Sequence, residues 1–282
     1  MQDAAIRIEP FFLEGARGPL FCLYLAPTDK LAQEGLLYLH PFAEEMHKSR
    51  RMVALQARAF ARAGYAVLQV DLTGCGDSAG DFGDASWEVW RDDAARAHAW
   101  LAAQVPGQLT LWGLRLGASL AAQLAPDLAR IKRLLLWQPV LNGDQFLTQF
   151  LRIKLASEML SEGQAQSGTK ELRAKLLEAG EAVEVGGYML APAMARALAR
   201  LKLNDLRPAS AVEWIELGAN AGDDVIPAAR RVLDTWREGG TTVHPYTVQG
   251  DPFWATQEIS VCPALLETSL RAVLENQARA KP

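Results

Sequence analysis

The sequence predicts an α/β fold in which a mostly parallel, doubly wound sheet carries a helical insertion. Short apolar runs alternate with helical segments through the first half of the chain and again near its end, as strands and crossover helices do in parallel sheets. The alternation stops between Asp144 and Asp205. The chain has 282 residues, of which 50% are hydrophobic, and this is enough to bury a large core.

The first half of the chain contains a predicted hairpin followed by alternating strands and helices. Extended segments at residues 6–13 and 20–26 flank a turn-rich stretch, which favours a β-hairpin. Short apolar runs predict buried strands at residues 35–40, 65–71, 109–112 and 133–138. Helical spacing predicts helices at residues 48–63, 86–104 and 116–124, with Ser86 as the N-cap of the second.

The interruption predicts a helical cap packed over the sheet. Residues 145–160, 170–179 and 191–202 have helical character, no convincing strand separates them, and residues 161–169 are typical of an exposed loop. We therefore expect a core domain at residues 1–143 and 206–282 and a cap at residues 144–205. In the second core segment, strands are predicted at residues 211–217 and 241–248, and helices at residues 226–238 and 263–277.

Composition excludes several classes of function. A formal charge of −4 and a pI near 5.7 give no reason to expect a nucleic-acid partner. The three cysteines are far apart and form no Cys-x-x-Cys pair, and the four histidines lack helical metal-site spacing. No glycine-rich stretch has the context of a nucleotide site. We expect neither a metal nor a cofactor.

Targeting and membrane signals are not found in the sequence. The first residues lack the basic and then apolar pattern of a signal peptide. No run of about 18 uninterrupted apolar residues is present that could cross a bilayer. We therefore expect a cytoplasmic protein.

The stretch at residues 109–122 organises the rest of the chain. An apolar run enters Gly113-Leu114-Arg115-Leu116-Gly117 and leaves as a helix of small residues, which is the layout of a nucleophile elbow. Such an elbow normally presents a serine, cysteine or aspartate at its tip, whereas this chain presents Arg115. The pattern thus predicts a hydrolase architecture without its usual nucleophile.

This arrangement resembles the α/β-hydrolase superfamily over nearly the whole chain. His40-Pro41-Phe42 occupies the place of the oxyanion loop, Asp71-x-x-Gly74-x-Gly76-x-Ser78 follows the next strand, and the elbow and the late helical cap come in family order. The stretch from His40 to Lys48, Trp112-Gly113-Leu114-Arg115-Leu116-Gly117 and Pro252-Phe253-Trp254 are similar to the second exosortase A system-associated hydrolase family. The resemblance implies bacteria that sort PEP-CTERM proteins and make exopolysaccharide, and no particular substrate.

Two of the three roles of a catalytic triad lack a candidate. Arg115 cannot attack a carbonyl, because a guanidinium stays protonated. After the last strand, where the family carries its histidine, the chain has Asp251, Pro252 and Trp254. Asp223 and Asp224 follow a strand where the family places its acid, and each is equally well explained as a carboxylate at a helix N-terminus. Ordinary serine-hydrolase chemistry is therefore not expected.

A cation at the elbow needs a negative partner. The helix N-terminus opposes it by roughly 0.3–1 kcal/mol. Glu44, Glu45, Asp223, Asp224 or Asp251 could supply an internal partner, or a ligand carboxylate or phosphate could bind there. Internal pairing is the simpler of the two.

The Glu44-Glu45-x-His47 cluster is the other polar group at the expected site. Glu45 and His47 could activate water by general acid–base catalysis, or the two acids could simply be helix caps. Around them, the expected binding pocket consists of residues that the fold brings to one rim: His40, Phe42, Glu44, Leu114, Arg115, Asp251 and Trp254.

Two hypotheses follow, and the sequence leaves open whether the chain is an enzyme. In the first, it hydrolyses a small anionic or lipid-like ester or thioester, with Arg115 binding the substrate anion and Glu45 and His47 handling water. In the second, it is a non-catalytic pseudo-hydrolase that binds a small-molecule ligand, a protein partner or a second copy of itself. An Arg115 bridged internally to an acid under a closed cap would count against the enzyme.

Overall fold

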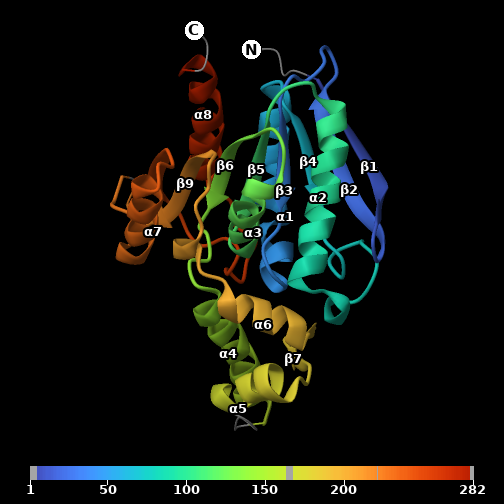
Figure 1. Ribbon diagram of the computed structural model, residues 1–282, viewed down its shortest axis with the longest axis vertical. Helices are drawn as coiled ribbons and strands as arrows, with labels where there is room; N and C mark the ends of the chain where they lie inside the picture. The colour runs from blue at the N-terminus through green and yellow to red at the C-terminus, as the bar shows by residue number, and fades with distance from the viewer. Residues whose placement is uncertain (1–4, 163–167, 221, 280–282) are drawn as a thin grey trace.

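The computed structural model describes residues 5–162, 168–220 and 222–279. They form an eight-stranded sheet in the order β1-β2-β4-β3-β5-β6-β9-β10 (Figure 1). The predicted hairpin is confirmed as β1 (Ile6–Gly15) and β2 (Gly18–Pro27), and β2 pairs antiparallel with β4 (Ala66–Val70). The other pairings are parallel and involve β3 (Gly35–Leu39), β5 (Leu109–Leu114), β6 (Ile131–Trp137), β9 (Ala211–Gly218) and β10 (Val243–Gln249). The predicted mostly parallel, doubly wound sheet is confirmed.

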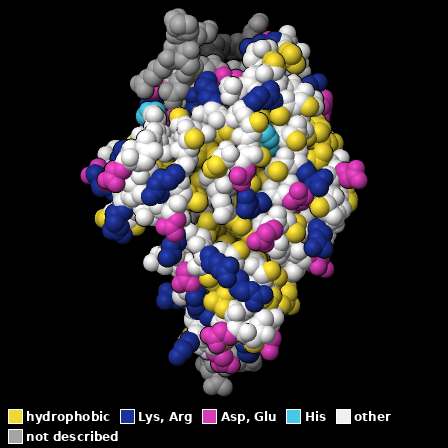
Figure 2. All heavy atoms as spheres, in the orientation of Figure 1, with side chains coloured by type: hydrophobic (Ala, Val, Ile, Leu, Met, Phe, Trp, Pro, Cys, Tyr) yellow, Lys and Arg dark blue, Asp and Glu magenta, His cyan; other side chains and the backbone are white. Residues whose placement is uncertain are grey.

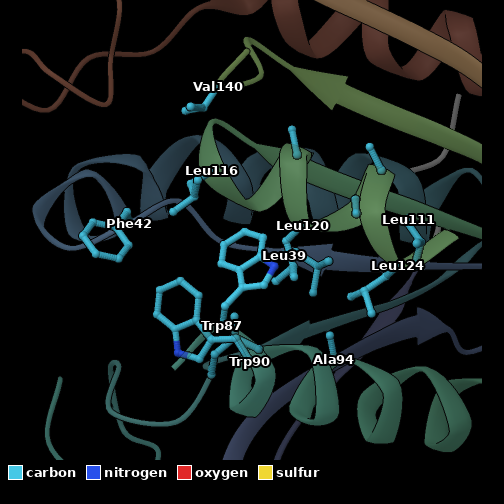
Figure 3. Packing of buried hydrophobic residues seen from close by; sticks show 14 of the residues in the cluster. Leu39, Phe42, Trp87, Trp90, Ala94, Leu111, Leu116, Leu120, Leu124 and Val140 are labelled. Carbon is cyan, nitrogen blue, oxygen red and sulfur yellow. The ribbon is translucent and has the colours of Figure 1, made fainter. Parts of the chain in front are cut away.

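Helices cover both faces of the sheet. Because alternate residues of a strand point to opposite faces, each strand contributes side chains to both cores. Leu37 and Leu39 of β3 belong to the core under α2 (Trp87–Gln104), α3 (Leu116–Leu124) and α7 (Pro227–Glu238). Leu36 and Tyr38 belong to the core under α1 (Glu44–Arg62) and α8 (Pro263–Arg279). Figure 3 shows the first core, in which α2 and α3 pack through large side chains. The N-cap prediction is confirmed, since Ser86 Oγ accepts a hydrogen bond from Val89 N at 3.2 Å.

Helix α1 begins earlier than predicted. Its first residue is Glu44 rather than Lys48, so Glu44, Glu45 and His47 lie in its first turns. The two acids favour this start because negative charges are stabilised at a helix N-terminus. The shift brings an acidic helix end to the carboxyl edge of the sheet, next to the elbow.

The insertion forms a lobe beyond the carboxyl ends of the strands (Figures 1 and 2). It contains α4 (Gly143–Glu162), α5 (Thr169–Ala174), a π-helical turn (Lys175–Ala179) and α6 (Pro192–Arg200). Of the predicted loop at residues 161–169, positions 163–167 lie outside the described residues, positions 161 and 162 end α4, and position 169 begins α5.

The expectation that the insertion contains no strand is wrong. β7 (Val183–Val185) and β8 (Tyr188–Leu190) pair antiparallel across Gly186 and Gly187. Both glycines have positive φ, 57° and 86°, which is the conformation that a two-residue hairpin turn requires. The glycine pair thus closes a hairpin, whereas the sequence suggested only a break before the next helix.

Short 3₁₀ helices complete the chain at Phe82–Asp84, Ala125–Asp127 and Leu203–Asp205. Within the described part of the chain, no helix combines the length and the apolar character needed to cross a membrane.

Candidate functional site

The elbow between β5 and α3 has the strained geometry that its glycines permit. Arg115 lies at the tip with φ 55° and ψ −118°, a conformation that a non-glycine residue rarely adopts. A Cβ atom on Gly113 would lie 2.5 Å from Ala118 N, and one on Gly117 would lie 2.2 Å from Leu39 O. Only glycine therefore fits on either side of the tip.

Backbone strain is also found at the carboxyl ends of the strands that flank β5. Ala43 follows β3 with φ 50°, and Gln138 follows β6 with φ 42°. The strands β3, β5 and β6 are neighbours and parallel, so Ala43, Arg115 and Gln138 all stand at their carboxyl ends. Such backbone strain is typical of functional sites, because the surrounding structure must be built to hold it.

The Arg115 side chain is held by internal contacts. Its Nε donates to Glu45 Oε1 at 3.2 Å, and the two side chains are 19% and 13% exposed. Nη1 lies 3.5 Å from the Gln138 carbonyl oxygen. Its Cζ lies 5.3 Å from the centre of the Trp254 ring, within the range of a cation–π contact. Of the five acids offered by the sequence, Glu45 is the one that pairs with Arg115.

Glu45 is the most perturbed acid at the site. Burial raises the pKa of its carboxyl from 4.5 to about 7, although the Arg115 charge opposes the change. Its second oxygen, Oε2, is buried and has no hydrogen-bond partner within the described structure. Its raised pKa lies close to the pH range in which a general base works.

Arg115 also lines a pocket of about 210 Å³ at the carboxyl ends of β6 and β9. Pro139, Val140 and Leu141 form an apolar wall. Helix α4 contributes Phe146 and two amide side chains, Gln145 and Gln149. Arg115 therefore has an internal partner in Glu45 and also lines an open pocket.

Glu216 lies in this pocket and was missed by the sequence analysis. It is 4% exposed, and its carboxyl accepts hydrogen bonds from Trp214 Nε1 at 3.0 Å and from Ile226 N at 3.1 Å. Burial raises the pKa of the Glu216 carboxyl. A charged residue inside a buried apolar strand was the signal that could have identified it.

The acids predicted after β9 and β10 do not line the Arg115 pocket. Asp223 and Asp224 line a different pocket, beside β10. Asp223 Oδ2 accepts from the backbone and side-chain nitrogens of Asn220, and Asp224 Oδ1 pairs with Arg230 at 2.8 Å. Asp251 is exposed. Asp224 is thus paired with helix α7 and Asp223 with its own turn, and neither contacts Arg115.

Two of the expected pocket residues, Phe42 and Leu114, are core residues. Phe42 is 1% exposed and contacts four aromatic rings: Phe82, Trp90, Phe146 and Phe150. Leu114 is buried in the core under α1 and α8. Neither side chain lines the pocket beside Arg115.

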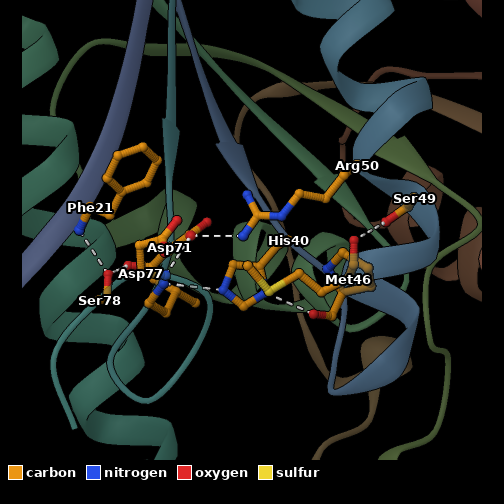
Figure 4. Close-up of polar contacts among 10 residues, drawn as sticks. Phe21, His40, Met46, Ser49, Arg50, Asp71, Asp77 and Ser78 are labelled. Carbon is orange, nitrogen blue, oxygen red and sulfur yellow. Dashed lines mark hydrogen bonds and ion pairs between the residues drawn. The ribbon is translucent and has the colours of Figure 1, made fainter. Parts of the chain in front are cut away.

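His40 is also buried, and both of its ring nitrogens are occupied. Nδ1 contacts the Pro41 carbonyl oxygen at 2.7 Å, and Nε2 accepts from Leu72 N at 3.1 Å, so the ring is neutral with its proton on Nδ1. Burial lowers the His40 pKa. Figure 4 shows this ring beside the Arg50–Asp71 ion pair, whose atoms are 2.7 Å apart. His40 therefore holds the loop after β4 in place.

The remaining members of the acidic cluster differ in exposure. Glu44 is half-buried and His47 is exposed. Only Glu45 of this cluster is in contact with Arg115.

Three side chains near the elbow that could in principle replace the missing nucleophile, Ser119, Cys75 and Ser78, are each buried or committed to other contacts. Ser119 is fully buried and donates to the Val140 carbonyl oxygen at 2.8 Å. Burial raises the pKa of the Cys75 thiol well above its ordinary range, so it remains a thiol. Ser78 Oγ is committed to the Asp71 carbonyl oxygen and to Phe21 N. In the part of the chain that is described, no cluster of three or more potential metal ligands occurs.

Solved structures with the same architecture cover almost the whole chain. Est1E from Butyrivibrio proteoclasticus, solved with ferulic acid, has a TM-score of 0.69 at 14% identity and covers 95% of this chain and 99% of its own. An α/β serine hydrolase without a lid from Xanthomonas campestris has a TM-score of 0.60 at 20% identity, covering 98% and 97%. Alpha/beta hydrolase domain-containing protein 10 from mouse has a TM-score of 0.58 at 14% identity, covering 97% and 100%. At these identities the likeness shows the fold.

A search of curated proteins finds no match. The family model described as serine aminopeptidase, S33, matches residues 36–182, just over half of the chain, and includes the elbow and part of the cap. The fold, the elbow geometry and this match agree: the chain belongs to the serine aminopeptidase S33 family of the α/β-hydrolase superfamily.

Proposed function

We propose that this chain is a non-hydrolysing member of its family that binds a small carboxylate in the pocket beside Arg115. The observation that carries the proposal is the position of Arg115, which is paired with Glu45, covered by the Trp254 ring and also lines an open pocket. A nucleophile and its histidine would occupy these positions in a working triad.

The pocket favours a short ligand with an apolar body. Its volume of about 210 Å³ is small for a ligand site, and its apolar wall suits an aliphatic chain. A guanidinium binds a carboxylate through two parallel hydrogen bonds. Because Glu45 competes for the same group, the ligand is expected to bind more tightly when Glu45 is protonated or removed.

The test combines labelling with binding. The wild-type chain is expected to resist a fluorophosphonate probe and to leave an ester panel of several chain lengths intact. Arg115→Ser, which returns a serine to the elbow tip, is assayed in parallel as the comparison variant. Labelling or turnover by the wild-type chain would overturn the non-catalytic assignment.

Hexanoate is the probe for binding, measured by titration calorimetry. Arg115→Gln is expected to weaken binding about tenfold or more, since a hydrogen bond to a charged group contributes roughly 1.5–3 kcal/mol. Glu45→Gln is expected to strengthen it. Equal affinity in the wild type and Arg115→Gln would refute the anion site.

A hydrolase is the second candidate, because Glu45 has a pKa of about 7 and a buried oxygen without a partner. In that case Glu45 would activate water toward a small ester or thioester. Turnover by the wild type that Glu45→Gln abolishes and that fluorophosphonate leaves untouched would favour this candidate.

The resemblance in Pro252-Phe253-Trp254 and the elbow supports a place in the exosortase A, PEP-CTERM and exopolysaccharide system. Deletion of the gene is expected to impair PEP-CTERM sorting or exopolysaccharide export. An unaltered strain would count against this assignment.

A further inference from the structure

A second, larger pocket lies beside β10, the last strand of the sheet, between α7 and α8. Figure 1 shows these two helices at the side of the molecule opposite the β1–β2 hairpin. The pocket has a volume of about 530 Å³, within the usual range of small-molecule sites. It is separate from the elbow, because Arg115 does not line it.

Charges of opposite sign line the two ends of this pocket. Asp223 and Asp224 follow the carboxyl end of β9 and line one end together with Arg230. Arg237 stands near the end of α7, shortly before β10 begins, and Arg271 stands two turns into α8. Because both helices return antiparallel to the strands, Arg237 and Arg271 lie toward the amino end of β10.

The direction of α8 is fixed by a contact farther along the helix. The Val273 carbonyl oxygen accepts from Arg133 Nη1 at 3.0 Å, and Arg133 is close to the amino end of β6. On α7, Arg230 and Arg237 are seven residues apart, which corresponds to about 10 Å of helix. The two charged ends of the pocket are therefore separated by about this distance.

The middle of the pocket is apolar with two hydroxyl groups. Leu233 and Val248 supply apolar surface, and Thr268 reaches it from α8. The Oγ1 of Thr247 is buried and has no hydrogen-bond partner within the described residues. A buried hydroxyl group without a partner is costly, so a ligand that bonds to it would be stabilised.

The arginines have weak competitors for a ligand. Arg237 pairs with Asp234 at 3.0 Å and Arg271 with Glu275 at 3.8 Å, and all four side chains are about half exposed. Exposed ion pairs of this kind contribute little, because water and salt screen them. A single carboxylate shared by both guanidinium groups could replace these contacts.

We infer that the pocket beside β10 binds an extended zwitterion, with its carboxylate between Arg237 and Arg271 and its amine at Asp223 and Asp224. Two aspartates at one end exceed the single Arg230, and each of the two arginines at the other end is held by one exposed acid that a ligand carboxylate can replace. A ligand with one charge of each sign matches both ends, whereas a dianion would meet the aspartates and a diamine would meet the arginines.

The experiment compares three probes of equal length: ω-aminooctanoate, octanedioate and diaminooctane. Binding is followed by titration calorimetry and by backbone amide shifts of the full chain. The wild type is expected to bind ω-aminooctanoate at least tenfold more tightly than the other two. Tighter binding of either other probe, or no saturable binding at millimolar concentrations, would overturn the inference.

Variants identify the site. Arg237→Gln and Arg271→Gln are each expected to weaken binding of ω-aminooctanoate about tenfold, the loss of one charged hydrogen bond. Thr247→Val keeps the shape of the side chain and is expected to weaken binding several-fold. Arg96→Gln is the matched control, since Arg96 is an exposed arginine paired with Asp92 on α2.

Two further measurements distinguish a loss of binding from a loss of folding. Thermal unfolding of each variant shows whether it is folded, and the amide shifts of α7 and α8 report the site directly if a variant is unstable. Arg115→Gln is expected to leave the ω-aminooctanoate-induced amide shifts of α7 and α8 unchanged, which separates the pocket beside β10 from the elbow site. Equal losses in Arg96→Gln and Arg237→Gln would show that the effect is a general one of charge.

Discussion

Replacement of Glu45 by glutamine should change how the stability of the protein depends on pH. The pKa of Glu45 rises from 4.5 to about 7 on folding, so the native chain binds this proton more tightly than the unfolded chain does. The stabilisation is therefore complete below about pH 4.5 and is lost as the pH rises through about 7. Glutamine has nearly the same shape and does not titrate.

The difference between the two pKa values corresponds to about 3 kcal/mol. This value needs little discount for solvent, because the Glu45 side chain is 13% exposed. Between about pH 5 and pH 8, the free energy of unfolding of the wild type, relative to Glu45→Gln, is expected to fall by about 2–3 kcal/mol.

Urea unfolding at several pH values, followed by circular dichroism, measures this difference. Other groups that titrate in the same range cancel in the comparison. Glu44→Gln is the control, since it removes the neighbouring charge and keeps the Arg115–Glu45 pair. A difference that is constant, or that grows with pH, would refute the reasoning and show that attraction to Arg115 outweighs the cost of burying Glu45.

Four further substitutions test the packing of the chain by urea unfolding. Phe42→Ala should lower the free energy of unfolding by about 3–5 kcal/mol, because it empties the aromatic cluster beneath the cap, and a loss below about 1 kcal/mol would contradict that packing. Gly76→Ala should be strongly destabilising, because the added Cβ would clash with the Asp71 carboxylate and the backbone φ is +56°. Gly187→Ala is the matched comparison: the space around Gly187 is open, so the substitution should cost only about 1–2 kcal/mol of backbone strain. Ser119→Ala should cost about 1 kcal/mol, because it removes the hydrogen bond to the Val140 carbonyl oxygen, and an unchanged free energy of unfolding would refute this structural role.

Sequence patterns predicted most of the fold because they depend on local periodicity. The central strands β3 and β5 are short, fully buried and mainly apolar runs, and Ser86 stands where a helix N-cap is needed. The β7–β8 hairpin was not predicted, because each of its strands has only three residues and the alternation of a strand cannot be recognised over so short a length. The start of α1 at Glu44 was not predicted, because Pro41 and Phe42 precede it and the helical spacing becomes clear only further along the chain.

The candidate site, too, could be predicted from the sequence only in part. That Arg115 stands at an elbow tip follows from Gly113 and Gly117, since both positions lack room for a Cβ atom. Which acid would neutralise Arg115 could not be read from the chain, because five acids were compatible with the same rim. Glu45 was selected by the start of α1, while the turn after β9 directs Asp223 and Asp224 to another pocket.

By itself, the sequence determined the α/β architecture, the elbow and the absence of a serine at its tip, because short-range periodicity and glycine sterics encode these features. Only the tertiary structure decided that Arg115 is bridged to Glu45 beneath Trp254, that Glu216 enters the pocket, and that His40 and Phe42 belong to the core. These outcomes depend on residues far apart in the chain. Their contacts and burial are settled when strands, helices and cap pack together, which no local pattern specifies.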